Sequence, residues 1–167
     1  SFPSNLIPRT LHGHMLSLMF LLLGALIGIT WLMVSMMVSS ILEEYIGRNA
    51  LNVSKAVSLT TVVQEGLKNK NSSKIQMYAE SVRKATGARF VVVGDHEGRR
   101  YSHPVPERIG KFMVGGDNPR ALEKGEAYVS KAVGTLGPSM RGKVPIFDDA
   151  GEVIGVVSVG YLQETVE

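Results

Sequence analysis

The longest apolar run of the chain lies near its N-terminal end. Met15 to Leu42 contains no charged residue and is rich in leucine, methionine, isoleucine and valine. A helix needs about 20 apolar residues to cross the hydrocarbon core of a membrane, and this run exceeds that length. A secretory signal peptide is the alternative, but its apolar core is only about 7–15 residues and ends at a small-residue cleavage site. No such site is evident, so the run predicts a transmembrane helix over 15–42.

The charges that flank this run indicate its orientation. Arg9 precedes the run, whereas Glu43 and Glu44 follow it. Basic residues stay on the cytoplasmic side of a membrane, and acidic residues contribute little to the choice. We therefore expect residues 1–14 to form an N-terminal cytoplasmic leader and residues 43–167 to form a domain outside the cytoplasm.

Helical periodicity continues beyond the apolar run. Apolar positions recur at spacings of three to five over 51–67, and no strong breaker separates them from the predicted span. The two segments can therefore form one continuous helix. A polar turn follows, in which Ser72 or Ser73 can serve as the N-cap of a second helix over 74–85. Gly87 is placed to end that helix.

The pattern then changes to short β-branched and apolar segments separated by turn residues. Five strands are expected, over 89–93, 99–102, 127–132, 139–147 and 153–161. The first two should pair as one hairpin and the last two as another. Between the hairpins, Asn118 can cap a short helix that begins at Pro119. Two helices followed by five mostly antiparallel strands predict a small α+β domain.

Composition and motifs exclude several classes of function. The chain has 18 basic and 15 acidic residues, a net charge of +3 and no cysteine. Because no run rich in lysine and arginine occurs, the sequence does not favour a nucleic-acid partner. It contains no G-x-S-x-G, H-E-x-x-H, P-loop or G-x-G-x-x-G motif, and His96 and His103 are isolated. We therefore expect no catalysis, no cofactor and no metal in this segment.

The segment 134–145 carries the candidate chemistry. Arg141 and Lys143 stand two residues apart in a predicted strand, so their side chains share one face of the sheet. The planar guanidinium suits a carboxylate, and the ammonium supplies a compact point charge. The pair favours binding of a small multivalent anion. Spacing alone leaves open an ordinary solvated strand face.

Four other residues could complete such a site, namely Arg100, His103, Gly134 and Gly137. The glycines would let backbone N–H groups approach a ligand. Charge-assisted hydrogen bonds contribute about 1.5–3 kcal/mol each, so three or four cations could hold a polycarboxylate at roughly micromolar affinity.

Several motifs stand together in the order seen in one family. They are Tyr101-Ser-His-Pro104, Arg108-Ile-Gly110, Gly115-Gly-Asp117, Ser139-Met-Arg-Gly-Lys-Val-Pro145 and Val153-Ile-Gly-Val-Val-Ser-Val-Gly-Tyr161. The chain resembles the extracytoplasmic PAS-like sensor domain, with its first membrane helix, of citrate and C4-dicarboxylate sensor histidine kinases. The resemblance covers about 43–162. It implies a five-stranded antiparallel sheet flanked by helices, held at the bacterial inner membrane by one span.

Carried over by position, the resemblance implies eight citrate-binding residues. Arg100 and His103 match an R-x-x-H pair of ligand contacts, and Arg141 and Lys143 match an R-x-K pair. The others are Gly134, Thr135 and Leu136 in a donor-rich loop, and Ser158 on the last strand. Lys143 indicates citrate, because dicarboxylate sensors tend to have phenylalanine there. Val92 departs from the threonine that a citrate sensor can have.

The resemblance also implies the role of the chain. It would be the citrate-sensing region of a two-component histidine kinase, passing ligand binding across the membrane and on to a cytoplasmic response regulator. No kinase segment is present, and the chain ends at Glu167, where a second span would begin. We expect a homodimer through the membrane helix and the helix after it. A malate or fumarate sensor, a membrane-tethered interaction domain without a ligand and a membrane-bound enzyme are the alternatives.

Overall fold

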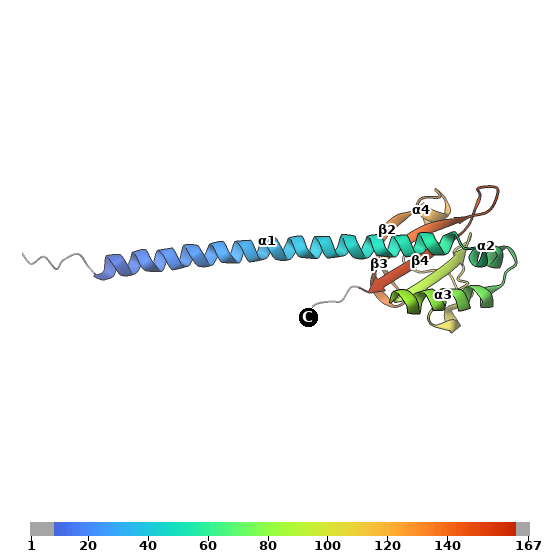
Figure 1. The fold of residues 1–167 in the computed structure, drawn as a ribbon, viewed down its shortest axis with the longest axis horizontal. Coiled ribbons are helices and arrows are strands. Elements are labelled where there is room, and N and C mark those ends of the chain that lie inside the picture. The colour runs from blue at the N-terminus through green and yellow to red at the C-terminus, as the bar shows by residue number, and fades with distance from the viewer. Residues whose placement is uncertain (1–8, 163–167) are drawn as a thin grey trace, which may run out of the picture. The chain divides into compact units, whose positions relative to one another are not determined.

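A computed structural model describes residues 9–162, so predictions for residues 1–8 and 163–167 lie outside the described residues. The chain divides into two compact units, Ser1–Leu42 and Glu43–Glu167. The elements, drawn in Figure 1, are α1 (Arg9–Ser58), α2 (Thr61–Lys68), α3 (Ser72–Thr86), β1 (Phe90–Asp95), η1 (Pro106–Arg108), α4 (Pro119–Leu122), β2 (Tyr128–Gly134), β3 (Gly137–Phe147) and β4 (Val153–Leu162).

The first unit contains the apolar part of α1. The helix runs without interruption through the predicted span, and its stretch Leu11–Ser58 is long and apolar enough to cross a membrane. None of its most apolar window is buried against the described chain. An apolar surface of this length suits the interior of a bilayer, and the helix fits a single span.

The second unit is built on one antiparallel sheet with the strand order β1-β4-β3-β2. The predicted α+β class is confirmed, but the sheet has four strands in the described residues. The segment predicted as a strand over 99–102 makes only isolated bridges. Ser102 explains this, because its hydroxyl accepts from the Val93 N–H (2.8 Å) and donates to the Val91 carbonyl (3.1 Å). A side chain thus occupies edge groups of β1 that a fifth strand would use.

Alternation along the strands gives the sheet two different faces. One face packs against α1, α2 and α3 and forms the main hydrophobic core. Its buried members are Val57, Val63, Leu67, Ile75, Ala79, Ala88, Val91, Val93, Ile146, Val157 and Val159. The opposite face carries the intervening residues, including Phe90, Val92, Arg141 and Ser158, and α4 and the segment before it lie over it.

Some helix boundaries differ from the predicted ones and others agree with them. α1 ends at Ser58 and α2 begins at Thr61, so the continuous helix considered through residue 67 is wrong. Asn71, rather than Ser72 or Ser73, caps α3 by accepting from the Lys74 N–H (3.1 Å). Gly87 ends α3 in the left-handed conformation (φ 69°), as predicted.

The part of α1 after Leu42 lies directly against β3 and β4. A Cβ at Gly142 would stand only 2.3 Å from the Leu51 backbone nitrogen, so the helix and strand touch backbone to backbone. The Ser54 hydroxyl donates to the Gly142 carbonyl (2.6 Å) and accepts from the Val159 N–H (3.2 Å). These contacts support the two central strands from behind.

Candidate functional site

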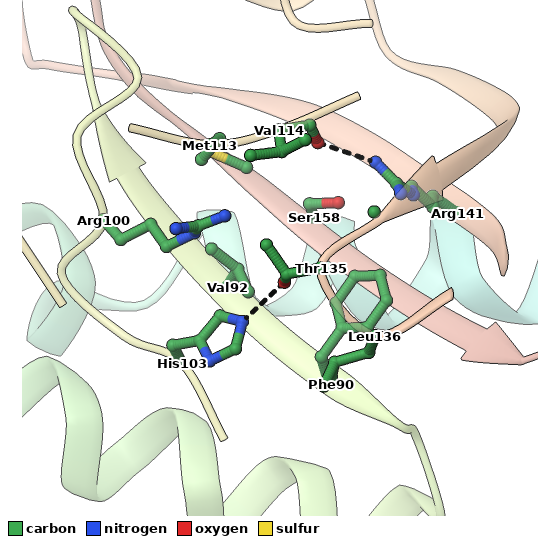
Figure 2. A pocket seen from close by; sticks show the side chains of 11 residues that line it. Phe90, Val92, Arg100, His103, Met113, Val114, Thr135, Leu136, Arg141 and Ser158 are labelled. Carbon is green, nitrogen blue, oxygen red and sulfur yellow. Dashed lines mark hydrogen bonds between the residues drawn. The ribbon is translucent and has the colours of Figure 1, made fainter. Parts of the chain in front are cut away.

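A pocket lies on the sheet face opposite α1, α2 and α3, and Figure 2 shows the side chains that line it. The cavity volume is about 30 Å³ in this structure, enough for one or two water molecules, and the pocket opens to solvent. A ligand of metabolite size would have to move the lining residues apart. Its lining comes from β1, β3, β4, the β2–β3 turn and the segment after β1, as Phe90, Val92, Arg100, His103, Met113, Val114, Gly134, Thr135, Leu136, Arg141 and Ser158.

The structure brings seven of the eight predicted site residues together around this pocket: Arg100, His103, Gly134, Thr135, Leu136, Arg141 and Ser158. Lys143 is not in the lining, and its side chain is completely buried. It nevertheless shares a strand face with Arg141 and stands opposite Ser158 in the β3–β4 pair. Lys143 therefore lies next to the pocket rather than in it.

Arg100 is a buried cation without an anionic partner. The residue is only 5 % exposed, and its guanidinium makes no hydrogen bond or ion pair with any of residues 9–162. Burial, and then Arg108, lowers the pKa of Arg100, but a guanidinium keeps its charge in proteins. Figure 2 shows the group extending into the pocket. Its nitrogen atoms are not among the buried polar atoms without a partner in the described chain, so they remain in contact with solvent at the pocket. The guanidinium is therefore open to an acceptor from outside the chain.

Arg141 is held by several protein acceptors instead. Its Nε donates to Ser139 Oγ (2.9 Å) and its Nη2 to the Ala132 carbonyl (3.2 Å). Its Nη1 donates to the Val114 carbonyl (3.3 Å) and lies 3.4 Å from Asp117 Oδ1. Each terminal nitrogen of arginine carries two hydrogens, so one Nη2 hydrogen remains for a ligand. Burial lowers the pKa of Arg141, and Asp117 opposes that shift.

Two glycines make room for the Arg141 guanidinium. A Cβ at Gly134 would lie 2.3 Å from Nη2, and a Cβ at Gly115 would lie 2.6 Å from Nη1. Gly115 also has φ 127°, which L side chains rarely adopt. Gly134 and Gly137 are the last paired residues of β2 and β3. The predicted glycine-rich loop is therefore a two-residue turn formed by Thr135 and Leu136.

His103 links the segment after β1 to this turn. Its ring is almost fully buried, and the Val105 N–H donates to Nδ1 (2.9 Å). Nδ1 also lies 3.1 Å from the Val105 carbonyl oxygen, and Nε2 lies 3.2 Å from Thr135 Oγ1, so either ring nitrogen can carry the proton of the neutral ring. Burial, and then Arg100, lowers the pKa of His103 from 6.5 to about 4. His103 is therefore a neutral donor at neutral pH in this structure.

Lys143 is paired with acceptors that precede α4. Its Nζ lies 3.1 Å from Asp117 Oδ1 and donates to Asn118 Oδ1. Burial lowers the pKa of Lys143 to about 8, although Asp117 acts in the opposite direction. Asn118 stands at the N-cap position of α4 but makes no side-chain capping bond, so the predicted capping role is wrong. Its amide oxygen accepts from lysine instead.

Ser158 supplies a second polar group without a partner. Its hydroxyl is buried and makes no hydrogen bond within the described chain. The residue lies in β4, between the segments that carry Arg100 and Arg141, and Figure 2 shows the hydroxyl at the pocket. A buried, unpartnered hydroxyl and a guanidinium without a protein acceptor around one cavity are complementary to an anionic ligand.

Sequence reasoning missed several residues that shape the site. Phe90 lines the pocket, and its ring centre lies 5.7 Å from Arg141 Cζ. The ring fits only because residue 160 is a glycine, since a Cβ there would lie 2.1 Å from Phe90 Cζ. Strand alternation could have found it, because Phe90 and Val92 share a face. Gln76 of α3 exchanges two hydrogen bonds with the His103 backbone (2.8 and 2.9 Å), and no sequence pattern signals that contact.

Comparisons with known proteins place the chain among sensor proteins. The family described as single cache domain 3 matches residues 36–167. The sensor protein CitS of Halalkalibacterium halodurans is 48% identical over 164 residues, which are 98% of this chain and 30% of that protein. The sensor histidine kinase CitA of Klebsiella pneumoniae is 38% identical over 152 residues, 89% of this chain and 28% of that protein. The chain thus spans less than a third of the length of these relatives.

Solved structures agree with these relatives. The crystal structure of the Escherichia coli DcuS sensor domain is 35% identical with a TM-score of 0.68, over 72% of this chain and 90% of that domain. The Vibrio cholerae DctB sensor domain, at 17% identity and a TM-score of 0.59, shares the fold. The PAS-like fold and the resemblance to citrate and C4-dicarboxylate sensor kinases are confirmed. The chain belongs to the single cache domain 3 family, in a form related to the sensor region of CitS, CitA and DcuS.

Proposed function

We propose that this chain is the citrate-binding sensor region of a two-component histidine kinase, with residues 43–167 outside the cytoplasm and residues 15–42 of α1 spanning the inner membrane. One observation carries the proposal. The Arg100 guanidinium has no acceptor among residues 9–162 and faces the same small pocket as Arg141 and the buried, unpaired Ser158 hydroxyl. Such a lining is complementary to an anion.

The lining offers donors from several sides and no carboxylate. Arg100 can bind one carboxylate in its planar fork, and the remaining Nη2 hydrogen of Arg141 can reach another. The hydroxyls of Thr135 and Ser158 and the neutral ring of His103 add uncharged polar groups. These groups come from separate elements, so a single small ligand with several carboxylates would join them.

Lys143 supports a tricarboxylate over a dicarboxylate. It is a third cation on the same strand face as Arg141, and it stands opposite Ser158 in the sheet. If its side chain turns away from Asp117, the ammonium lies beside a ligand that Ser158 contacts. Three carboxylates would then meet Arg100, Arg141 and Lys143.

A C4-dicarboxylate sensor is the second candidate. It is supported by the position of Lys143, which does not line the pocket in this structure. Two cations remain in the lining, which suits two carboxylates. A relative from Bacillus subtilis named as a probable C4-dicarboxylate sensor kinase is also 34% identical over 119 residues.

Calorimetric titration of the full chain in lipid nanodiscs tests the proposal with citrate and malate. Citrate should bind at roughly micromolar affinity and more tightly than malate. Arg100→Ala should weaken citrate binding by about tenfold or more, because charge-assisted hydrogen bonds are lost. Arg99→Ala is the matched control, since Arg99 is exposed and stacks on Phe112. Equal affinity for malate would refute the citrate assignment, and absence of binding by either acid would refute the sensor proposal.

The proposed receptor is a homodimer that pairs along α1. A ligand can shift a receptor only if it binds one conformation better than another, and pairing would transmit such a shift through adjacent spans. Because the chain contains no cysteine, Ser35→Cys in α1 introduces a single thiol. Oxidative crosslinking of this variant in membranes should yield a covalent dimer, whereas recovery of monomer alone would contradict the pairing.

A further inference from the structure

The carboxylate of Asp117 lies between two of the cations assigned to the ligand. Its Oδ1 is 3.1 Å from Lys143 Nζ and 3.4 Å from Arg141 Nη1. The lysine side chain is fully buried, the arginine side chain is 4 % exposed and the aspartate side chain is 13 % exposed. These three groups form a nearly dry ion cluster at the edge of the pocket.

The chain is built to hold Asp117 in this place. Gly115 and Gly116 precede it with φ values of 127° and 66°, conformations that favour glycine. The second carboxylate oxygen, Oδ2, accepts from the Ser130 hydroxyl of β2 (2.8 Å). Both oxygens are therefore engaged, one by two cations and the other by a hydroxyl. The carboxylate is fixed in position as a bound ligand would be.

We propose that Asp117 is an internal counter-anion that occupies Lys143 and part of Arg141 in the ligand-free protein, and so sets the affinity of the pocket and its preference among carboxylates. This inference rests on the proposed carboxylate-sensing function. Asp117 occupies the two cations of the R-x-K pair, whereas Arg100 has no acceptor among residues 9–162. A ligand would thus meet Arg100 first and compete with Asp117 for the others.

The competition depends on the charge of the ligand. Each negative charge that enters the pocket is repelled by Asp117, and burial strengthens that repulsion. Citrate, with three carboxylates, is repelled more than malate, with two. Asp117 therefore reduces the advantage that Lys143 gives to citrate. Removing the charge while keeping the side-chain shape should strengthen the binding of both acids, and of citrate more.

Asp117→Asn in the full chain tests this inference, by calorimetry in nanodiscs with citrate and malate. The dissociation constant should fall by roughly tenfold for citrate and by roughly threefold for malate. Asp149→Asn is the matched control, because its side chain is 93% exposed and pairs with Lys68; both constants should stay unchanged. A purely structural role for Asp117 would not change the ratio of the two affinities in favour of citrate.

Outcomes for the inference and for the proposed function can be told apart. If the parent binds citrate and Asp117→Asn binds it no more tightly, the inference is overturned and the function stands. If Asp117→Asn binds citrate where the parent does not, the inference is supported. If neither binds any carboxylate, both fail. If Asp117→Asn does not fold, Ser130→Ala is the second variant, because it removes the hydroxyl that holds Asp117 Oδ2. Citrate and malate should then both bind more tightly, by a smaller factor than in Asp117→Asn. Unchanged affinities in Ser130→Ala would overturn the inference.

Discussion

Lys143→Met should make the ligand-free protein more stable while removing the proposed preference for citrate. The lysine side chain has no exposed surface, and methionine has a similar length without a charge to bury. In the variant, Asp117 Oδ1 would still lie 3.4 Å from Arg141 Nη1, and Asp117 Oδ2 would still accept from the Ser130 hydroxyl at 2.8 Å. The substitution therefore leaves no isolated buried charge. The residue that best indicates citrate is thus expected to be costly for folding.

The pKa of Lys143 gives the size of that cost. Burial lowers it from 10.5 to about 8 even with Asp117 beside it, so loss of hydration outweighs attraction to the carboxylate. Each tenfold change in proton affinity corresponds to about 1.4 kcal/mol, so holding the charged form in the folded state at pH 7 costs about 3 kcal/mol. Because the variant also loses the hydrogen bond from Lys143 to Asn118, its free energy of unfolding should rise by only about 1–3 kcal/mol.

The same shift predicts how the stability of the parent depends on pH. Because the folded-state pKa is depressed, the folded protein loses this proton near pH 8 while the unfolded chain keeps it to about 10.5. The unfolded state binds more protons in that window, so the parent should become more stable as pH rises from 8 to 10. Lys143→Met should lack this rise. Above pH 10 the raised pKa of Tyr128, about 12, acts in the opposite direction.

Thermal unfolding of the full chain in nanodiscs, followed by circular dichroism, measures both effects. At pH 7 the Tm of Lys143→Met should exceed that of the parent by roughly 2–12 °C. Lys131→Met is the control, because Lys131 is half exposed and pairs with Glu43 at the surface, where an ion pair contributes at most about 1 kcal/mol. A Tm equal to or below that of the parent would show that the pairing of Lys143 outweighs its burial, and would refute this reasoning.

Two further substitutions test the other groups of the pocket. The folded-state pKa of His103, about 4, lies below the ordinary 6.5, so the unfolded chain binds the proton first and stability should fall by up to about 3 kcal/mol as pH drops from 6.5 to 4. His103→Gln should flatten this decline in Tm, and an unchanged decline would contradict the shift. Gly134→Ala would place a Cβ 2.3 Å from Arg141 Nη2 and displace the guanidinium. Citrate affinity should fall by about tenfold or more in calorimetry, and wild-type affinity would show that the guanidinium can move without cost.

Local pattern predicts the fold class and four residues of the pocket lining, Arg100, His103, Gly134 and Arg141, whereas the family resemblance supplies Thr135, Leu136 and Ser158. Period-two alternation predicts that Arg141 and Lys143 share one face of a strand, and both lie on one face of β3. The prediction of a fifth strand is wrong because Ser102 uses its side chain to bond the edge of β1. Residues 99–102 have strand composition and make backbone bonds from the Asp95 N–H to the Arg99 carbonyl (3.0 Å) and from the Tyr101 N–H to the Val93 carbonyl (2.7 Å). Composition does not reveal that the Ser102 hydroxyl takes the next groups of the β1 edge.

The pairing of Lys143 could not be predicted from the sequence for a different reason. Its partner Asp117 lies in a loop whose path is set by two glycines with positive φ, and its neighbours in the sequence are typical of an ordinary turn. Alternation states which face a side chain takes, but not which loop folds over that face. Pairing between a strand and a distant loop depends on tertiary packing, which periodicity does not encode.

The contacts behind the pocket suggest which strand can respond to a ligand. β3 is fixed to α1, because Gly142 leaves no room for a Cβ and its carbonyl accepts a 2.6 Å bond from Ser54. β4 is held more loosely, by a 3.2 Å bond from the Val159 N–H to Ser54 and a 3.1 Å bond between Tyr161 and Asn49. A ligand that draws Ser158 toward Arg100 would therefore shift β4 rather than β3. Since Val159 directly follows Ser158, we expect the bond to Ser54 to be the first to change, and amide hydrogen exchange at Val159 to report it.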